Sequence, residues 1–185
     1  MNAFEYLSVL VSIVLGLGIT QLLTGFGRWL EQRDTFRAYA PAIAWAAFLL
    51  LVHVQTWWTM FGMDEYESWN FLQFTTVLLQ PILLFLLAVI VFPGPHARSS
   101  DLRQNFHAQR RWFFGLLIAV LAASLLKDAA RGELPEPMNL LFHAVFMVQA
   151  VLGIVSAGER LQRYLAYSSL AIFSVYIALL FAELG

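Results

Sequence analysis

Long apolar runs separated by short polar connections form the main pattern of this chain. Six runs approach or meet the length of about 20 mostly apolar residues that a helix needs to cross a bilayer. They cover residues 4–26, 41–61, 71–92, 112–130, 138–157 and 164–184. Lipid offers the backbone no hydrogen bonds, so such runs are expected to be helical. The pattern predicts an all-α fold: a polytopic integral membrane protein with a six-helix transmembrane bundle, forming a single domain over residues 1–185.

Only the connection between the third and fourth runs is long enough to hold structure of its own. It opens with the turn Pro-Gly-Pro at 93–95 and continues with a polar stretch that contains two well-placed apolar residues. Ser100 or Asp101 can cap a helix there, because their side chains accept hydrogen bonds from the first free backbone amides. We therefore expect a short interfacial helix over about 99–110, lying in the cytoplasmic headgroup region.

The first run carries small residues at every fourth position, namely Ser8, Ser12, Gly16, Thr20 and Thr24. On an α-helix these positions form one slowly drifting stripe. Small residues let helices approach closely in lipid, where apolar surface alone gives no driving force for association. The stripe predicts helix packing, within the chain or between protomers; the alternative is a hydroxyl-lined water path.

Two features of the chain suggest an internal repeat. The third and sixth runs begin with FLQFTTVLL and YLAYSSLAI, which share an order of aromatic, leucine, hydroxyl and aliphatic residues. The fourth run also repeats the small stripe of the first, with Gly115, Ala119 and Ala123 at four-residue steps. Two halves of three spans each would have opposite orientations, which is the inverted-repeat plan of many transporters. The alternative is chance similarity, because membrane sequences draw on few residue types.

The cationic residues lie mainly on one side of the predicted bundle. Nine of the eleven Lys and Arg residues fall in the first, third and fifth connections, whereas Lys127 and Arg131 are the only two in the second and fourth. Such an excess marks the cytoplasmic side. We therefore expect a multi-pass protein of the cell (inner) membrane with both termini outside.

The predicted outer side collects carboxylates, including Asp64, Glu65, Glu67, Asp128 and Glu133. One interpretation is that they concentrate cations at an entrance. The other is that they form a solvated rim, which the positive-inside rule leaves free to be acidic, and we prefer it. Lys127 and Asp128 are included in this rim.

Composition agrees with the membrane class and excludes several kinds of chemistry. The chain is 60% hydrophobic and 12% charged, far from the roughly 25% charged residues of soluble domains. A net charge of −1 gives no reason to expect a nucleic-acid partner. The absence of cysteine removes disulfides, thiolate metal sites and cysteine nucleophiles.

Five polar residues inside the runs form the candidate ion or solute pathway: His53, Thr76, Gln80, His143 and Gln149. Polar groups in hydrocarbon are costly unless they have partners or line a functional path. The functional interpretation is a polar site near mid-membrane, beside the kink that a proline in the third run would cause. The alternative is that these side chains join helices by hydrogen bonds, with the histidines neutral.

Cofactor and enzyme signals are weak. Two histidines within spans are compatible with haem or metal ligation, but no cysteine or carboxylate lies firmly at their depth, so no metal or cofactor is expected. We find no GxSxG, HExxH or phosphate-binding glycine loop, so an enzyme is not favoured.

Two functions remain open from the sequence. The first is a transporter or channel for a small ion or solute, acting through the polar site. The second is a non-transporting scaffold, sensor or assembly subunit that acts through its small-residue surfaces. The expected partners are the lipid bilayer and either further copies of the chain or other membrane subunits.

Overall fold

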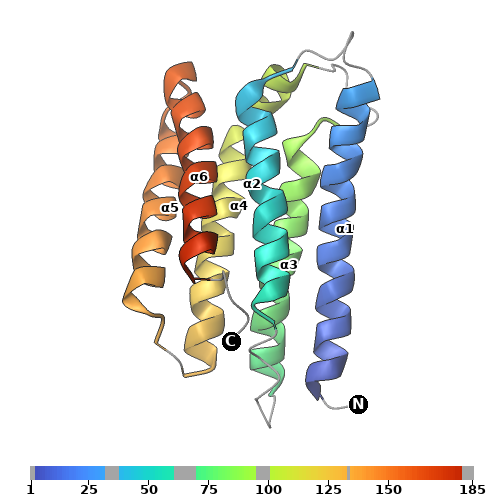
Figure 1. Ribbon diagram of the computed structural model, residues 1–185, viewed down its shortest axis with the longest axis vertical. Coiled ribbons are helices and arrows are strands. Elements are labelled where there is room, and N and C mark those ends of the chain that lie inside the picture. The colour runs from blue at the N-terminus through green and yellow to red at the C-terminus, as the bar shows by residue number, and fades with distance from the viewer. Residues whose placement is uncertain (1–2, 32–37, 61–69, 95–100, 133, 181–185) are drawn as a thin grey trace.

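The computed structural model describes residues 3–31, 38–60, 70–94, 101–132 and 134–180. These residues contain six α-helices and no strand, which confirms the predicted all-α class. The helices are α1 (Ala3–Glu31), α2 (Ala40–Trp58), α3 (Phe71–Val91), α4 (Leu102–Ala130), α5 (Pro137–Val155) and α6 (Glu159–Leu180). They lie side by side along the long axis of the molecule and alternate in direction (Figure 1).

Five of the described helices, α1 to α5, are long and apolar enough to cross a membrane. This finding supports a multi-pass membrane protein. The acidic outer face was predicted in part from carboxylates that lie outside the described residues, namely Asp64, Glu65, Glu67 and Glu133.

Local sequence signals explain where several helices begin. Pro41 and Pro137 stand in the first turns of α2 and α5, where a proline costs no hydrogen bond. Asn70 and Gln73 form a reciprocal capping box at the start of α3. The Asp101 carboxylate accepts hydrogen bonds from the backbone amides of Arg103 and Gln104 at 2.8 and 3.2 Å, so this predicted cap is confirmed.

The predicted short helix over about 99–110 is not a separate element. From Leu102 the chain runs as one helix of 29 residues into the fourth span, about 44 Å long. No proline interrupts this stretch, and the buried face that begins with Leu102 and Phe106 continues through Phe113 and Leu117. The expectation of a break was wrong because it relied on the polar residues, which occupy the outer face of a continuous helix.

Five helices form a closed ring. Along it α2 packs on α3, α3 on α4, α4 on α5, α5 on α6, and α6 returns to α2. Helix α1 lies at the edge of the bundle and packs on α2 and α3 (Figure 1). We call α2 to α6 the five-helix ring.

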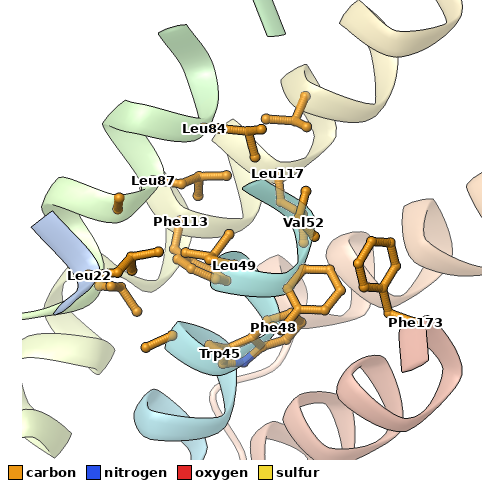
Figure 2. Close-up of a cluster of buried hydrophobic side chains, with 14 of the residues drawn as sticks. Leu22, Trp45, Phe48, Leu49, Val52, Leu84, Leu87, Phe113, Leu117 and Phe173 are labelled. Carbon is orange, nitrogen blue, oxygen red and sulfur yellow. The ribbon is translucent and has the colours of Figure 1, made fainter. Parts of the chain in front are cut away.

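The core of the ring is rich in aromatic side chains. Trp45 of α2 is fully buried, and its indole meets the rings of Phe48, Phe113 and Phe114 edge-on at centroid distances of 5.1 to 5.4 Å. Such edge-to-face pairs add about 0.5–1.5 kcal/mol each beyond the burial of their area. Figure 2 shows how side chains from α1, α2, α3, α4 and α6 meet around Leu49.

The face of α1 that packs within the chain is not the predicted stripe. The buried positions follow one another in steps of four or three residues, at Leu7, Val11, Leu15, Gly18, Leu22 and Gly25. By contrast, the stripe of Ser8, Ser12, Gly16, Thr20 and Thr24 is partly or largely exposed. A β-carbon on Gly16 would meet no atom within 4 Å, and the same holds for Gly115 of α4. Close approach within the chain occurs instead at Gly18, Gly25 and Gly153.

The predicted inverted repeat receives no support from the packing of the described helices. In such a repeat the pair α1 and α3 would correspond to the pair α4 and α6. Helix α1 packs extensively on α3, whereas α4 and α6 share no comparable contact in the part of the chain that the structure describes.

Candidate functional site

A cavity of about 330 Å³ lies inside the five-helix ring. Its walls come from the last turns of α2 and α4, the first turns of α5, the last described turns of α6, and Gln80 of α3. The cavity therefore extends from the middle of the bundle toward the end at which α4 stops and α5 begins.

The deep part of the cavity is mainly apolar, and Gln80 of α3 is its polar exception. Its wall includes three phenylalanine rings, from Phe48, Phe146 and Phe173, together with aliphatic side chains of α2 and α4. The ring centroids of Phe48 and Phe173 are 5.2 Å apart, and those of Phe48 and Phe146 are 5.7 Å apart. These rings also pack against one another, so they form a firm wall between the cavity and the core.

The other end of the cavity is charged. Lys127 and Asp128 of α4 line it and expose only 9% and 8% of their surface. Arg131, directly after the helix, lines it too and pairs with Asp128, with 2.9 Å between Nη2 and Oδ1. Burial lowers the pKa of the Arg131 guanidinium, whereas the Asp128 carboxylate raises it, and an arginine stays charged under either influence.

The turn after α4 explains why these charges are buried. Gly132 adopts φ of 75°, the left-handed conformation that commonly ends a helix. The chain then reverses, and α5 packs back along α4. As a result the last turn of α4 faces the side chains of α5 and α6 instead of open solvent.

Lys127 differs from the neighbouring charged residues in its contacts. Within the described residues its ammonium group donates no hydrogen bond and has no carboxylate within ion-pair distance, although Asp128 and Arg131 act on it electrostatically. It is also the only lysine of the chain, because ten of the eleven cationic residues are arginines. The site thus contains one lysine whose side chain is buried and whose ammonium has no hydrogen-bonded anion among the described residues.

Polar side chains of α5 and α6 complete this end of the cavity. The Tyr176 hydroxyl donates to Oδ1 of Asn139 at 3.2 Å. The ring of His143 bonds through Nδ1 to the carbonyl of Asn139 at 2.9 Å. A carbonyl only accepts, so Nδ1 carries a proton and donates to it.

Of the five residues predicted to form a pathway, Gln80 and His143 line the cavity. His53 does not, because its ring points to α1 and is fully buried against Gly18. Its Nδ1 bonds to the carbonyl of Leu49 at 2.7 Å, and its Nε2 has no hydrogen-bond partner in the described part of the chain.

Gln149 and Thr76 also lie away from the cavity. The Gln149 amide donates to Ser168 at 3.3 Å and accepts a short hydrogen bond from the Ser169 hydroxyl, so it links α5 to α6. The Thr76 hydroxyl donates to the carbonyl of Gln73 in its own helix at 2.9 Å. The five predicted residues therefore do not line one common cavity.

Lys127 and Asp128 were expected on a solvated rim, because they lie within a few residues of the end of a span. Both side chains are instead buried and line the cavity. The signal that could have separated them from the rim is the position of Pro137, which starts α5 only a few residues after α4 ends. So short a connection requires the next helix to pack beside the last turn of α4.

A second polar cluster lies at the opposite end of the ring, where α5 stops. Arg110, expected in the headgroup region, is buried, and its guanidinium donates to the carbonyls of Gly153, Ile154 and Ser156. Gln162 of α6 donates to two of these carbonyls. Because the last carbonyls of a helix have no partners within it, this cluster caps α5.

Within the described residues, no three His, Asp or Glu side chains come close enough together to hold a metal ion. The cavity brings buried charged side chains next to a volume of ligand size, and it is the candidate site. A comparison of the chain with protein-family models, with curated proteins and with solved structures finds no match.

Proposed function

We propose that this chain is a small transport protein with six spans, which binds a small solute in the cavity of the five-helix ring and carries it across the membrane. The observation that carries the proposal is the placement of Lys127 and Asp128, both buried near the end of a membrane-length helix and both lining the cavity. Charged side chains within membrane helices are costly, and those that occur face water-filled cavities or solute paths.

The size and lining of the cavity also support solute binding. Its volume of about 330 Å³ lies at the lower end of the range of small-ligand pockets, roughly 300–1,000 Å³. It combines an apolar wall with a few convergent polar groups, as such pockets do. A charge pair that served only to join helices would not need an adjoining cavity.

The proposed topology counts α6 as the sixth span. Its first turns carry Glu159, Arg160 and Arg163, and the rest of the described helix is mainly apolar. Nine of the eleven cations lie in the connections of one side, which is then cytoplasmic. In this arrangement the charged end of the cavity faces the outer side of the inner membrane, and the first and last helices start and end there.

Transport is tested with purified protein in proteoliposomes. Three solutes of similar size but different charge serve as labelled probes: benzenesulfonate, phenylalanine and benzyltrimethylammonium. None crosses a bilayer readily, so uptake above that of protein-free vesicles reports the protein. We expect uptake of at least one probe.

A matched pair of variants ties uptake to the cavity. Ser124→Phe fills the cavity from α4, whereas Ala122→Phe places the same ring on an exposed position of the same helix. Uptake should be lost in the first and kept in the second. If the folded wild type takes up none of the three probes, or if both variants behave alike, the transport proposal is wrong.

The stripe on α1 favours a second function, that of an assembly subunit. Its members Ser8, Ser12, Gly16, Thr20 and Thr24 are not buried by the chain itself, and small residues let another helix approach closely. In this proposal a second copy or another membrane subunit packs on α1. Gly16→Leu would then abolish the oligomer seen by light scattering of the detergent complex, with Leu17→Ala as an exposed control. An unchanged mass in Gly16→Leu would count against it.

A further inference from the structure

We propose that the solute is an organic monoanion with an apolar body, whose anionic group binds the Lys127 ammonium while its body lies among the phenylalanine rings deeper in the cavity. The inference deepens the proposed function and rests on it, because it names the chemical class that the cavity takes. Its test is nevertheless a binding measurement, which does not require transport.

The charge of the cavity favours an anion. Three groups with full charges line it, and two of them, Asp128 and Arg131, form an ion pair with each other. Lys127 has no such partner among the described residues, so of the three charges that line the cavity its positive charge is the one without an ion pair there, and we assign it to the ligand. A buried cation without a paired anion is costly, and a bound carboxylate or sulfonate would remove that cost.

Other roles of Lys127 do not account for its surroundings. A lysine in the last turn of a helix interacts favourably with the helix dipole, but an exposed lysine does so as well. A lysine near the end of a span commonly extends its ammonium to the interface, yet this side chain is only 9% exposed and lines the cavity. The burial of this side chain beside the cavity is the observation that points to a ligand.

The polarity of the cavity wall sets the shape of the ligand. The charged groups belong to the final residues of α4, whereas Phe48, Phe146 and Phe173 belong to positions nearer the middle of their helices. A ligand that enters with its anionic group at Lys127 would therefore extend its other end into an apolar, aromatic environment. A fully polar anion such as acetate would leave that part of the cavity unfilled.

The hydrogen-bonding groups next to Lys127 suit an acceptor. Ser124 lines the cavity one turn before Lys127 on the same helix. A serine hydroxyl can donate to a carboxylate or sulfonate oxygen, whereas the Tyr176 hydroxyl already donates to Asn139. The Lys127 ammonium supplies the charge-assisted contact, and the Ser124 hydroxyl helps to define the position of the anionic group.

Equilibrium binding to the detergent-solubilised protein shows how much the charge of the ligand and how much its ring contribute to affinity. Phenylacetate, 2-phenylethanol and phenethylamine share one ring and differ in the charge of their polar group, and acetate has the charge without the ring. We expect phenylacetate to bind more tightly than the other three by about tenfold or more, as one charge-assisted contact implies. Equal binding of phenylacetate and 2-phenylethanol would overturn the proposal.

Variants of Lys127 test the contact directly. Lys127→Met should weaken phenylacetate binding by about ten- to a hundredfold, while Lys127→Arg, which keeps the charge, should retain most of it. Ser124→Phe keeps Lys127 and fills the cavity, so it should abolish binding without removing the charge. Retention of full affinity in the methionine variant, checked for folding by gel filtration, would contradict the assignment.

The single lysine allows a readout on the unmodified chain. An amine-acetylating reagent can modify only Lys127 and the α-amine of a chain whose tag contains no lysine. Phenylacetate should slow acetylation of Lys127, as measured by mass spectrometry, and leave the rate at the α-amine unchanged. Equal rates at Lys127 with phenylacetate and with 2-phenylethanol would count against binding at this residue.

The two proposals fail in different ways. If phenylacetate binds through Lys127 but no probe enters proteoliposomes, the ligand class stands and the transport function falls. If a probe is transported, Ser124→Phe blocks it and Lys127→Met changes neither uptake nor binding, the transport function stands and the ligand class falls.

Discussion

The imidazole of His53 lies directly against Gly18, where a β-carbon on residue 18 would come within 2.2 Å of Nε2. The ring is held in place by the bond from Nδ1 to Leu49 and is fully buried, so it has no room to retreat. This contact fixes the distance between α1 and α2 and makes Gly18, not Gly16, the glycine that the packing requires.

Gly18→Ala should therefore destabilise the protein. Overpacking of a tight contact costs about 1–3 kcal/mol, whereas the gain in helix propensity is at most about 1 kcal/mol. Gly16→Ala has the same gain and no clash, so it should be neutral or stabilising. Thermal unfolding in detergent, followed by tryptophan fluorescence, checks this difference; equal midpoints for the two variants would contradict the contact.

Arg110→Met should lower stability by about 1–3 kcal/mol, because buried carbonyls at the end of α5 lose a charged donor. Arg111→Met is the matched control, since Arg111 is the next residue and is exposed. Both changes remove one cation from the same end of the bundle, so any effect on membrane orientation is common to them. A larger loss of stability in the Arg111 variant would exclude the proposed cap.

Asp128→Asn should strengthen the binding of phenylacetate about three- to tenfold. The amide keeps the shape of the side chain but removes the negative charge that offsets Arg131 in the cavity. Glu136→Gln, at an exposed position, should change little because solvent screens its charge. Weaker binding in Asp128→Asn, with folding intact, would show that the carboxylate itself contacts the ligand.

The proposed orientation is testable with single cysteines, since the chain has none of its own. Leu134→Cys, at a position 94% exposed, should react with a membrane-impermeant maleimide added to the outer side of the inner membrane. Gln104→Cys, exposed near the start of α4, should react only after that membrane is permeabilised. The reverse pattern would invert the topology.

Apolar length was a sufficient guide to the helices. The runs over 41–61, 71–92 and 138–157 correspond to α2, α3 and α5 to within a few residues where the chain is described. The run predicted over 112–130 misses the first part of α4, because the polar residues before it were taken to mark a helix boundary. A polar first half remains helical when its apolar positions continue one face, as Leu102 and Phe106 do.

The face of α1 was chosen wrongly for packing within the chain because two regular patterns coexist on it. Small residues at four-residue steps suggested one face, while the steps of four or three residues from Leu7 to Gly25 mark the face that is buried. The second pattern is the periodicity expected when helices pack at a shallow angle. A glycine on the buried face indicates a close approach between helices, whereas a glycine on the exposed face does not.

The candidate site was harder to predict from the sequence than the helices, because it depends on which helices become neighbours. Gln149 was expected in one pathway with Gln80, but the register of α5 against α6 gives it Ser168 and Ser169 as hydrogen-bond partners instead. His53 was expected to lie in the same site, but its side chain faces α1. The depth of a residue in the membrane follows from its position along the helix. The helix that its side chain faces depends on how the helices are arranged around one another.

The closure of the five-helix ring by α2 and α6 has a consequence for biogenesis. These two helices are separated by about a hundred residues of chain, so the wall of the cavity is incomplete until α6 has left the ribosome. Every shorter nascent chain exposes the last turn of α4, with its only lysine, to lipid or to the insertion machinery. The cavity is therefore the last part of the protein to be assembled, and truncation before α6 would remove it while leaving most of the helices in the membrane.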